Sequence, residues 1–223
     1  MSNQNISYTS SQASVLSTNK VLRNTYALLS MTLLFSALTA GVSMVVNPPH
    51  FISLVTSIAA IGLIWFVLPK TANSSKGLYV VFAFAGLMGF GLGPILNTYL
   101  NTANGGQIIM TALGGTGIIF LALSAYALTT RKDFSFMGGM LMVGLIVVLI
   151  AAIANIFLAM PALSLTISAV VILLMSGFIL FDTGRIINGG ETNYIMATVS
   201  LYLNIYNIFV SLLQLLGIFG SDD

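Results

Sequence analysis

The sequence predicts an all-α membrane protein: a seven-transmembrane-helix bundle with the N-terminus in the cytoplasm, the C-terminus outside and the seventh helix at its centre. One observation is that apolar runs long enough to cross about 30 Å of hydrocarbon recur seven times along the 223 residues. The other is that, with seven spans, every Lys and Arg falls on one side of the membrane, as is typical of cytoplasmic loops. The predicted spans are residues 25–46, 51–68, 78–96, 107–129, 134–159, 163–181 and 194–219.

The basic residues decide the number of spans. Two precede the first run and five fall in alternate connections: Lys20, Arg23, Lys70, Lys76, Arg131, Lys132 and Arg185. The remaining connections, residues 47–50, 97–106 and 160–162, carry no Lys or Arg. A different number of helices would scatter the cations over both faces of the membrane.

The composition excludes a water-soluble domain. Hydrophobic residues make up 57% of the chain and charged residues 5%, against about 25% charged residues in a soluble domain. The mean hydropathy is +1.03. The net charge of +2 comes from cations dispersed in short loops, so it does not indicate a nucleic-acid partner. The chain has no cysteine, which excludes disulfides and thiolate metal sites. The lipid bilayer is therefore the expected partner of most of the surface.

Residues 1–19 differ from the rest of the chain. They are rich in Ser, Asn, Gln and Thr, carry no charged side chain and show no sustained apolar period. We therefore expect a flexible cytoplasmic tail over residues 1–19, followed by a seven-helix transmembrane domain over residues 20–223. Cations come only at Lys20 and Arg23, and no small-residue cleavage site follows the first run, so the first span is expected to be a retained signal anchor.

The third predicted span carries small residues on one face. Gly86, Gly89 and Gly93 recur at helical spacing, and Pro94 follows them. Small residues let the backbone of a neighbouring helix approach closely, which favours a packing surface. A hinge is the alternative, because a Gly-Pro pair at this depth frees backbone groups that neighbours or water must satisfy.

A polar stripe distinguishes the seventh predicted span. Its members recur at intervals of 4, 3, 4 and 3 residues: Ser200, Asn204, Asn207, Ser211 and Gln214. At about 1.5 Å per residue, they share one helix face over roughly 20 Å. Lipid cannot hydrogen-bond these groups, so the stripe must face other helices or water, which predicts a central position for this helix. The sequence leaves open whether the stripe bonds neighbouring helices or lines a polar path.

Asp182 is the one carboxylate inside or at the rim of a predicted span, and Arg185 follows three residues later. At that spacing the two side chains can pair on one helix face. One interpretation is an interfacial ion pair at the cytoplasmic end of the sixth span. The other is a titratable gate group that is reached from the cytoplasm.

The reactive side chains of the sequence do not fit an enzyme. His50 is the only histidine and lies in an outer turn beside two prolines. Neither a metal site nor a serine nucleophile with a histidine base is therefore available inside a span. Asp182 has no second intramembrane aspartate as an acid–base partner, and no phosphate-binding glycine loop with its lysine occurs. We expect no catalytic residue, no metal and no cofactor.

Two segments resemble the signature of a known family. Residues 89–96, GFGLGPIL, resemble the G-x-x-L-G-P-x-L core of the BAX inhibitor-1 family. Residues 108–117, IIMTALGGTG, resemble the other half of that signature, with glycine at 117 where the pattern has alanine. Residues 181–183 and 194–209 are similar to the last two helices of that family, which has seven spans with the last in the middle. The sequence of residues 188–194, NGGETNY, most resembles that of the bacterial inner-membrane branch of the family.

One function implied by this resemblance is a pH-sensitive leak with calcium or protons as permeant ions. Some bacterial members are described as calcium leak channels whose sensor is a pair of aspartates on the sixth and seventh helices. Asp182 matches the aspartate of the sixth helix, but Asn204 stands where the family has the aspartate of the seventh. An Asp–Asn pair lacks the like-charge repulsion of two carboxylates, so we expect weaker gating near neutral pH than in a two-aspartate relative. A basic latch at the cytoplasmic end of the second helix is also described, and Lys70 is the nearest candidate.

The bacterial branch instead resembles a modulator of the membrane-anchored, ATP-dependent FtsH-type zinc protease. Such a motor must grip an unstructured cytoplasmic segment, which residues 1–19 offer, while a compact bundle behind them would resist extraction. Asn204 and the branch resemblance favour this protease modulator, which would act in membrane protein quality control and stress response in the bacterial inner membrane. The two functions can coexist.

Overall fold

The helices of the structure match the seven predicted spans. The computed structural model describes the backbone of residues 3–219 and the side chains of residues 18–218. Seven helical segments in this part of the chain are long and apolar enough to cross a membrane: Thr18–Val46, Phe51–Thr71, Lys76–Leu100, Gly105–Thr130, Ser135–Leu158, Pro161–Ile187 and Tyr194–Ile218. Each predicted span overlaps one of these segments, so the predicted all-α class with seven spans is confirmed.

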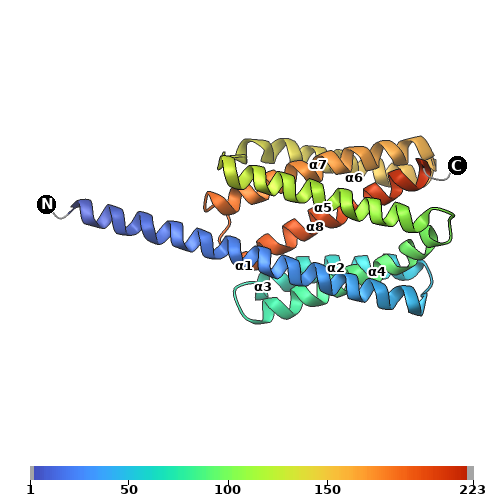
Figure 1. Ribbon diagram of the computed structural model, residues 1–223, viewed down its shortest axis with the longest axis horizontal. Helices are drawn as coiled ribbons and strands as arrows, with labels where there is room; N and C mark the ends of the chain where they lie inside the picture. Colours follow the sequence, from blue (N-terminus) through green and yellow to red (C-terminus); the bar gives the residue numbers. More distant parts are fainter. Residues whose placement is uncertain (1–2, 220–223) are drawn as a thin grey trace.

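Eight α-helices within residues 3–219 build these spans (Figure 1). They are α1 (Asn3–Val46), α2 (Phe51–Gly62), α3 (Leu68–Thr71), α4 (Lys76–Leu100), α5 (Gly105–Thr130), α6 (Gly138–Leu158), α7 (Pro161–Ile187) and α8 (Tyr194–Phe219). The second span joins α2 to α3 through a π-helical turn over Leu63–Val67. A 3-10 turn over Ser135–Met137 precedes α6.

The first helix begins earlier than the sequence suggests. The backbone of α1 is helical from Asn3, and its first part projects beyond the bundle (Figure 1). Residues 3–19 thus continue the helix of the first span, and the flexibility expected of this tail stays a prediction. These residues contain no proline or glycine to end a helix that starts in the membrane. Their location in the cytoplasm stays a prediction.

A π-helical turn interrupts the second predicted span. The N–H of Leu68 donates to the carbonyl oxygen of Leu63, five residues earlier. Pro69 explains the wider turn, because proline has no N–H to continue the α-helical pattern and its ring crowds the preceding turn. The sequence locates this proline but does not show that the helix passes through it.

The last helix, α8, lies between two groups of helices. It contacts α1 and α4 on one side and α5 and α7 on the other, and Figure 1 shows it crossing between these groups. In its most apolar window 44% of the residues are buried, compared with 50% in the span formed by α4 and 11% in the span that contains α6. The packing agrees with the central position expected from the polar stripe.

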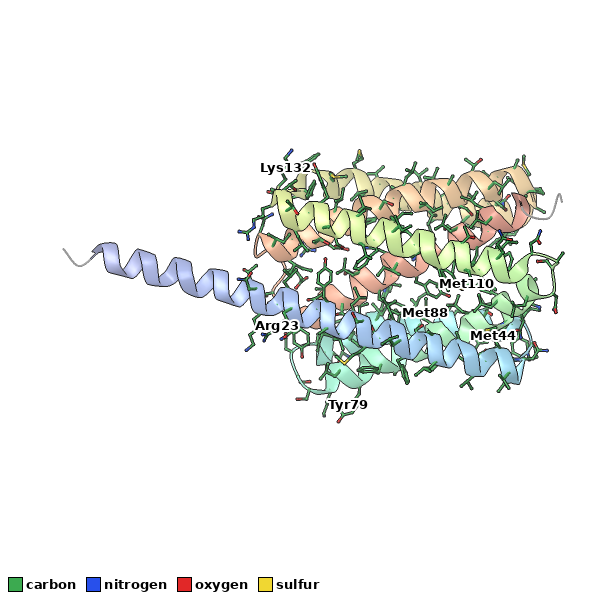
Figure 2. All side chains as sticks on the ribbon, in the orientation of Figure 1. Arg23, Met44, Tyr79, Met88, Met110 and Lys132 are labelled. Carbon is green, nitrogen blue, oxygen red and sulfur yellow. The ribbon has the colours of Figure 1, made fainter. Side chains whose placement is uncertain are left out.

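The two ends of the bundle differ in charge. Arg23 and Lys132 lie toward the end from which α1 projects, whereas Met44 and Met110 lie toward the opposite end (Figure 2). The first turns of α1 and the last turns of α8 also lie at opposite ends (Figure 1). This arrangement is consistent with seven spans and with cations on one side of the membrane. The assignment of the basic end to the cytoplasm stays a prediction.

The small residues of α4 face α1. A Cβ atom on Gly89 would collide with the backbone carbonyl of Ser36, and one on Gly93 would collide with the side chain of Ser43. A Cβ atom on Gly86 would lie 3.0 Å from a ring carbon of α1. The two helices approach this closely because these α4 positions lack side chains.

The proline of α4 does not end the helix. α4 continues through Pro94 to Leu100. In the preceding turn, Ser53 Oγ of α2 donates to the carbonyl oxygen of Gly91 at 2.7 Å. A neighbouring helix thus satisfies a backbone group close to the missing N–H of the proline, as hydrocarbon requires. A hinge at this position stays a prediction.

Candidate functional site

Asp182 and Asn204 meet at the interface between α7 and α8. The amide Nδ2 of Asn204 donates to Oδ2 of Asp182 at 2.8 Å. Asn204 is 5% exposed, and Asp182 is half-buried. Both helices are apolar around these positions, so the two polar groups satisfy each other inside the bundle rather than facing lipid. The two positions that the resemblance assigns to a sensor are therefore in direct contact.

Arg185 binds the loop between α7 and α8. Its Nη2 lies 3.7 Å from Oε2 of Glu191 and donates to the carbonyl oxygen of Gly190 at 3.2 Å. Gly189 has a φ of +75°, a conformation that glycine adopts readily, and it turns the chain back toward the end of α7. The Asp182–Arg185 pair considered from the sequence is thus replaced by an Arg185–Glu191 pair. The loop conformation brings in a partner that helical spacing alone cannot reveal.

A very small cavity lies beside this contact. Its volume is about 10 Å³, roughly the space that one water molecule requires. The lining residues come from α7, α8 and the loop between them: Asp182, Arg185, Ile186, Glu191, Ala197 and Ser200. A hydrated cation does not fit in this space. The contact observed at this site is the hydrogen bond from the Asn204 amide to the Asp182 carboxyl, and a titrating role for Asp182 stays a prediction.

The rest of the polar stripe is also held within the bundle. Gln214 Oε1 accepts a hydrogen bond from Ser168 Oγ of α7 at 2.8 Å. Nδ2 of Asn207 donates to the carbonyl oxygen of Leu203 in its own helix at 2.8 Å, and Ser211 is buried. The stripe therefore bonds α7 at two levels, roughly 15 Å apart along α8. Hydrogen bonding between helices has direct support, whereas a polar path stays a prediction.

Lys70 lies apart from this site. It is on α3, at the end of the second span, and its side chain is exposed. Among the side chains of residues 18–218, Lys70 makes no ion pair. The family resemblance suggests that Lys70 acts as a basic latch, and this role stays a prediction.

Our sequence analysis missed Asn193, which connects two loops at the basic end. Its Oδ1 accepts hydrogen bonds from the N–H groups of Ile195 and Met196 at 2.9 and 3.2 Å, and so caps α8. Its Nδ2 donates to the carbonyl oxygen of Ala72 at 3.0 Å and to Oδ1 of Asn73 at 2.8 Å. An asparagine directly before an apolar run predicts the cap. The contact with the other loop depends on tertiary folding.

The described residues do not form a metal site. No group of three or more His, Asp or Glu side chains that could hold a metal ion occurs among them. Besides the Asn204 amide, the polar residues around Asp182 are Arg185, Glu191 and Ser200, and the Arg185 guanidinium is a cation that has no electron pair to offer a metal.

Comparison with known proteins identifies the family. The family model described as "Inhibitor of apoptosis-promoting Bax1" matches residues 18–221. The chain belongs to this BAX inhibitor-1 family. The match includes all seven spans and both members of the Asp182–Asn204 contact, so the resemblance inferred from the sequence motifs is confirmed.

Bacterial proteins are similar to this BAX inhibitor-1 family member over nearly their whole length. A protein of Escherichia coli K12 named "Modulator of FtsH protease YccA" is 58% identical over 218 residues, which cover 98% of each chain. The same figures hold for a protein of another Escherichia coli strain named "Inner membrane protein YccA". A Vibrio cholerae protein named "Uncharacterized membrane protein" is 54% identical over 215 residues, or 96% of each chain. The predicted multi-pass location in the bacterial inner membrane is confirmed by this relationship.

Proposed function

We propose that this chain binds a membrane-anchored, ATP-dependent protease of the FtsH type and modulates its action on other membrane proteins. The observation that carries the proposal is the 58% identity, over 98% of both chains, to the protein named "Modulator of FtsH protease YccA". Similarity of that extent includes most of the N-terminal segment and all loops at the basic end. Under the predicted orientation, a cytoplasmic protease domain reaches these parts.

The position of the N-terminal segment supports this proposal. Residues 3–17 belong to α1 but precede the first span, Thr18–Val46, and the family match begins at residue 18. In Figure 1 this part of α1 extends beyond the bundle. A helical segment of about 15 residues is marginal in water unless it is packed against other elements. It can therefore open into the extended chain that an ATP-driven motor grips.

The bundle behind this segment resists extraction. α1 is held against α4 where Gly89 and Gly93 admit the α1 backbone, and α8 packs against helices on both of its sides. Pulling α1 out of the membrane therefore breaks its contacts with α4, α7 and α8 together. A protease that engages the segment is occupied while it works against this resistance, which slows its action on other substrates.

A deletion of residues 1–19 tests this mechanism. We expect the full-length chain to co-purify with the protease and to be degraded slowly in cells, and the deletion variant to persist longer. A control chain in which a Gly–Ser sequence of equal length replaces residues 1–19 separates the effect of length from that of sequence. Unchanged association and turnover in the deletion variant would contradict the mechanism, and failure of the full chain to co-purify would contradict the function itself.

One observation favours a second function. Asp182 and Asn204 touch at 2.8 Å between α7 and α8, at the positions that the family resemblance assigns to a pH sensor. We propose as the alternative that rearrangement of this contact lets calcium or protons leak across the membrane. The cavity of about 10 Å³ beside Asp182 must widen for an ion to pass.

Calcium flux into vesicles separates the two functions. The measurement compares the wild-type chain with Asp182→Asn from acidic to mildly alkaline pH. A wild-type flux that depends on pH and is altered by Asp182→Asn supports the leak. The absence of flux in both proteins excludes it, and a protease modulator is expected to tolerate the substitution.

A further inference from the structure

A large apolar groove runs between α1 and α5. Its volume is about 610 Å³, within the range of about 300–1,000 Å³ that is usual for ligand pockets. α1 and α5 each pack against α8 but not directly against each other's backbone, and Figure 1 shows them on either side of α8. Tyr202 and Tyr206 of α8 line the groove together with Leu92 and Leu96 of α4. The groove is separate from the Asp182 site, which lies where α8 meets α7.

Small residues widen the groove. Gly41 of α1 and both Gly106 and Gly117 of α5 line it, and a Cβ atom added to any of them would meet no atom within 4 Å. Gly89 of α4, by contrast, marks a close contact with α1. The absence of side chains at these three positions leaves room in the groove for an occupant from the bilayer.

The groove lies mainly in one half of the bilayer. Its lining comes from residues 33–44 of α1, 92–100 of α4 and 106–120 of α5, which lie next to the α1–α2 and α4–α5 loops. Along α5 the lining extends roughly 21 Å at 1.5 Å per residue, somewhat more than half of the hydrocarbon thickness of about 30 Å. Toward the basic end, the rings of Tyr26 and Phe120 bridge α1 and α5 with centroids 6.0 Å apart. The hydrocarbon of one leaflet is about half of this 30 Å thickness, so an acyl chain of that leaflet covers most of the groove's depth.

The chemistry of the lining favours hydrocarbon. Ser36 Oγ and the Tyr202 hydroxyl share a hydrogen bond of 2.6 Å, and Thr116 Oγ1 donates to the carbonyl oxygen of Ala112 at 2.7 Å. These hydroxyl groups therefore need no hydrogen bond from a ligand. The rim is continuous with the lipid-facing surface, where Met110 is 69% exposed. Lipid chains reach the groove directly from the bilayer.

We propose that the groove between α1 and α5 binds one acyl chain of a phospholipid from this half of the bilayer. The bound chain completes the packing on α8 and holds α1 and α5 apart. A transmembrane helix of another protein fits less well, because it crosses the whole hydrocarbon layer and would meet the bridge between Tyr26 and Phe120.

The test uses a phosphatidylethanolamine that carries a photoreactive diazirine in one acyl chain. The purified full-length chain is placed in nanodiscs that contain this lipid, illuminated, and analysed by mass spectrometry for the sites of covalent labelling. We expect labelling to concentrate on Met44 of α1 and on Phe209 of α8, which line the groove; Phe209 is only 7% exposed. Ile153 of α6, which is 51% exposed, reports labelling by bulk lipid.

Two substitutions in α5 form a matched pair. A Cβ atom at Gly114 or Gly117 would meet no atom within 4 Å, and of the two positions only Gly117 contributes to the lining of the groove. We expect Gly117→Leu to lower labelling of Met44 and Phe209 by roughly tenfold, equivalent to about 1.4 kcal/mol. Gly114→Leu is expected to leave the labelling unchanged. Gly41→Leu fills the groove from the α1 side and replaces Gly117→Leu if that variant does not fold.

Three results would overturn the proposal. One is equal labelling of the groove and of Ile153. Another is groove labelling that neither Gly117→Leu nor Gly41→Leu reduces. The third is cross-linking of groove residues to a second protein instead of lipid in native membranes, which would identify the groove as a helix-docking surface.

Discussion

Replacing Asn204 with leucine removes the amide that donates to Asp182 Oδ2 at 2.8 Å. A hydrogen bond to a charged group contributes about 1.5–3 kcal/mol in soluble proteins, whereas bonds between membrane helices average about 0.6 kcal/mol. Because Asn204 is only 5% exposed, little water can replace its amide. We therefore expect Asn204→Leu to lower the free energy of unfolding by about 2 kcal/mol, near the middle of these values.

The double variant makes this prediction specific to the contact. Asp182→Leu combined with Asn204→Leu replaces both partners with apolar groups, which is often nearly neutral. We expect the double variant to be more stable than the sum of the two single effects by at least about 1 kcal/mol. Reversible unfolding in mixed detergent micelles, followed by helical circular dichroism, gives the four free energies.

Asn207→Leu is the matched control. Its Nδ2 donates to the carbonyl oxygen of Leu203 in its own helix, so its loss does not break a bond between helices. We expect a smaller effect on stability than for Asn204→Leu. Additive single effects, within about 0.5 kcal/mol, would refute the inference that the Asp182–Asn204 contact joins α7 to α8.

Three further predictions concern packing, a cap and a turn. Gly89→Ala should destabilise the bundle by about 1–3 kcal/mol through overpacking against α1. Gly114 faces open space, so Gly114→Ala should be neutral or stabilising by up to about 1 kcal/mol. Equal effects of the two substitutions in thermal unfolding would contradict the close approach of α4 to α1. Asn193→Ala should lower stability by about 1 kcal/mol through loss of the α8 cap, and unaltered amide exchange in the first turn of α8 would argue against that role. Hydrogen bonds from Ser135 hold the pKa of Asp133 below its usual value. Protection of the Ser135 amide from hydrogen exchange should therefore be present above about pH 3.9. It should be lost as the pH falls through the lowered pKa of Asp133 in the folded chain. Protection that does not change with acid pH would contradict this.

The spans could be predicted from the sequence because hydrocarbon imposes strong local constraints. An apolar run of sufficient length and a one-sided set of cations depend on composition and position alone. The central position of α8 followed from its polar stripe for the same reason, since lipid cannot satisfy those groups. The family resemblance placed Asp182 and Asn204 on neighbouring helices, and their contact at 2.8 Å is a finding of the structure.

Contacts that depend on loop conformation could not be predicted in this way. Helical spacing suggested Asp182 as the partner of Arg185, but the loop turns at Gly189 and presents Glu191. Asn193 reaches Ala72 only because two loops meet at the same end of the bundle. The groove between α1 and α5 also escapes sequence analysis, because it arises from helices that do not pack on each other.

The most direct measurement for the proposed function is the degradation of a second membrane protein by a purified FtsH-type protease in proteoliposomes, with increasing amounts of this chain. We predict that degradation slows as the chain is added and that Asp182→Asn slows it to the same extent. An unchanged degradation rate in the presence of excess folded chain would contradict the account.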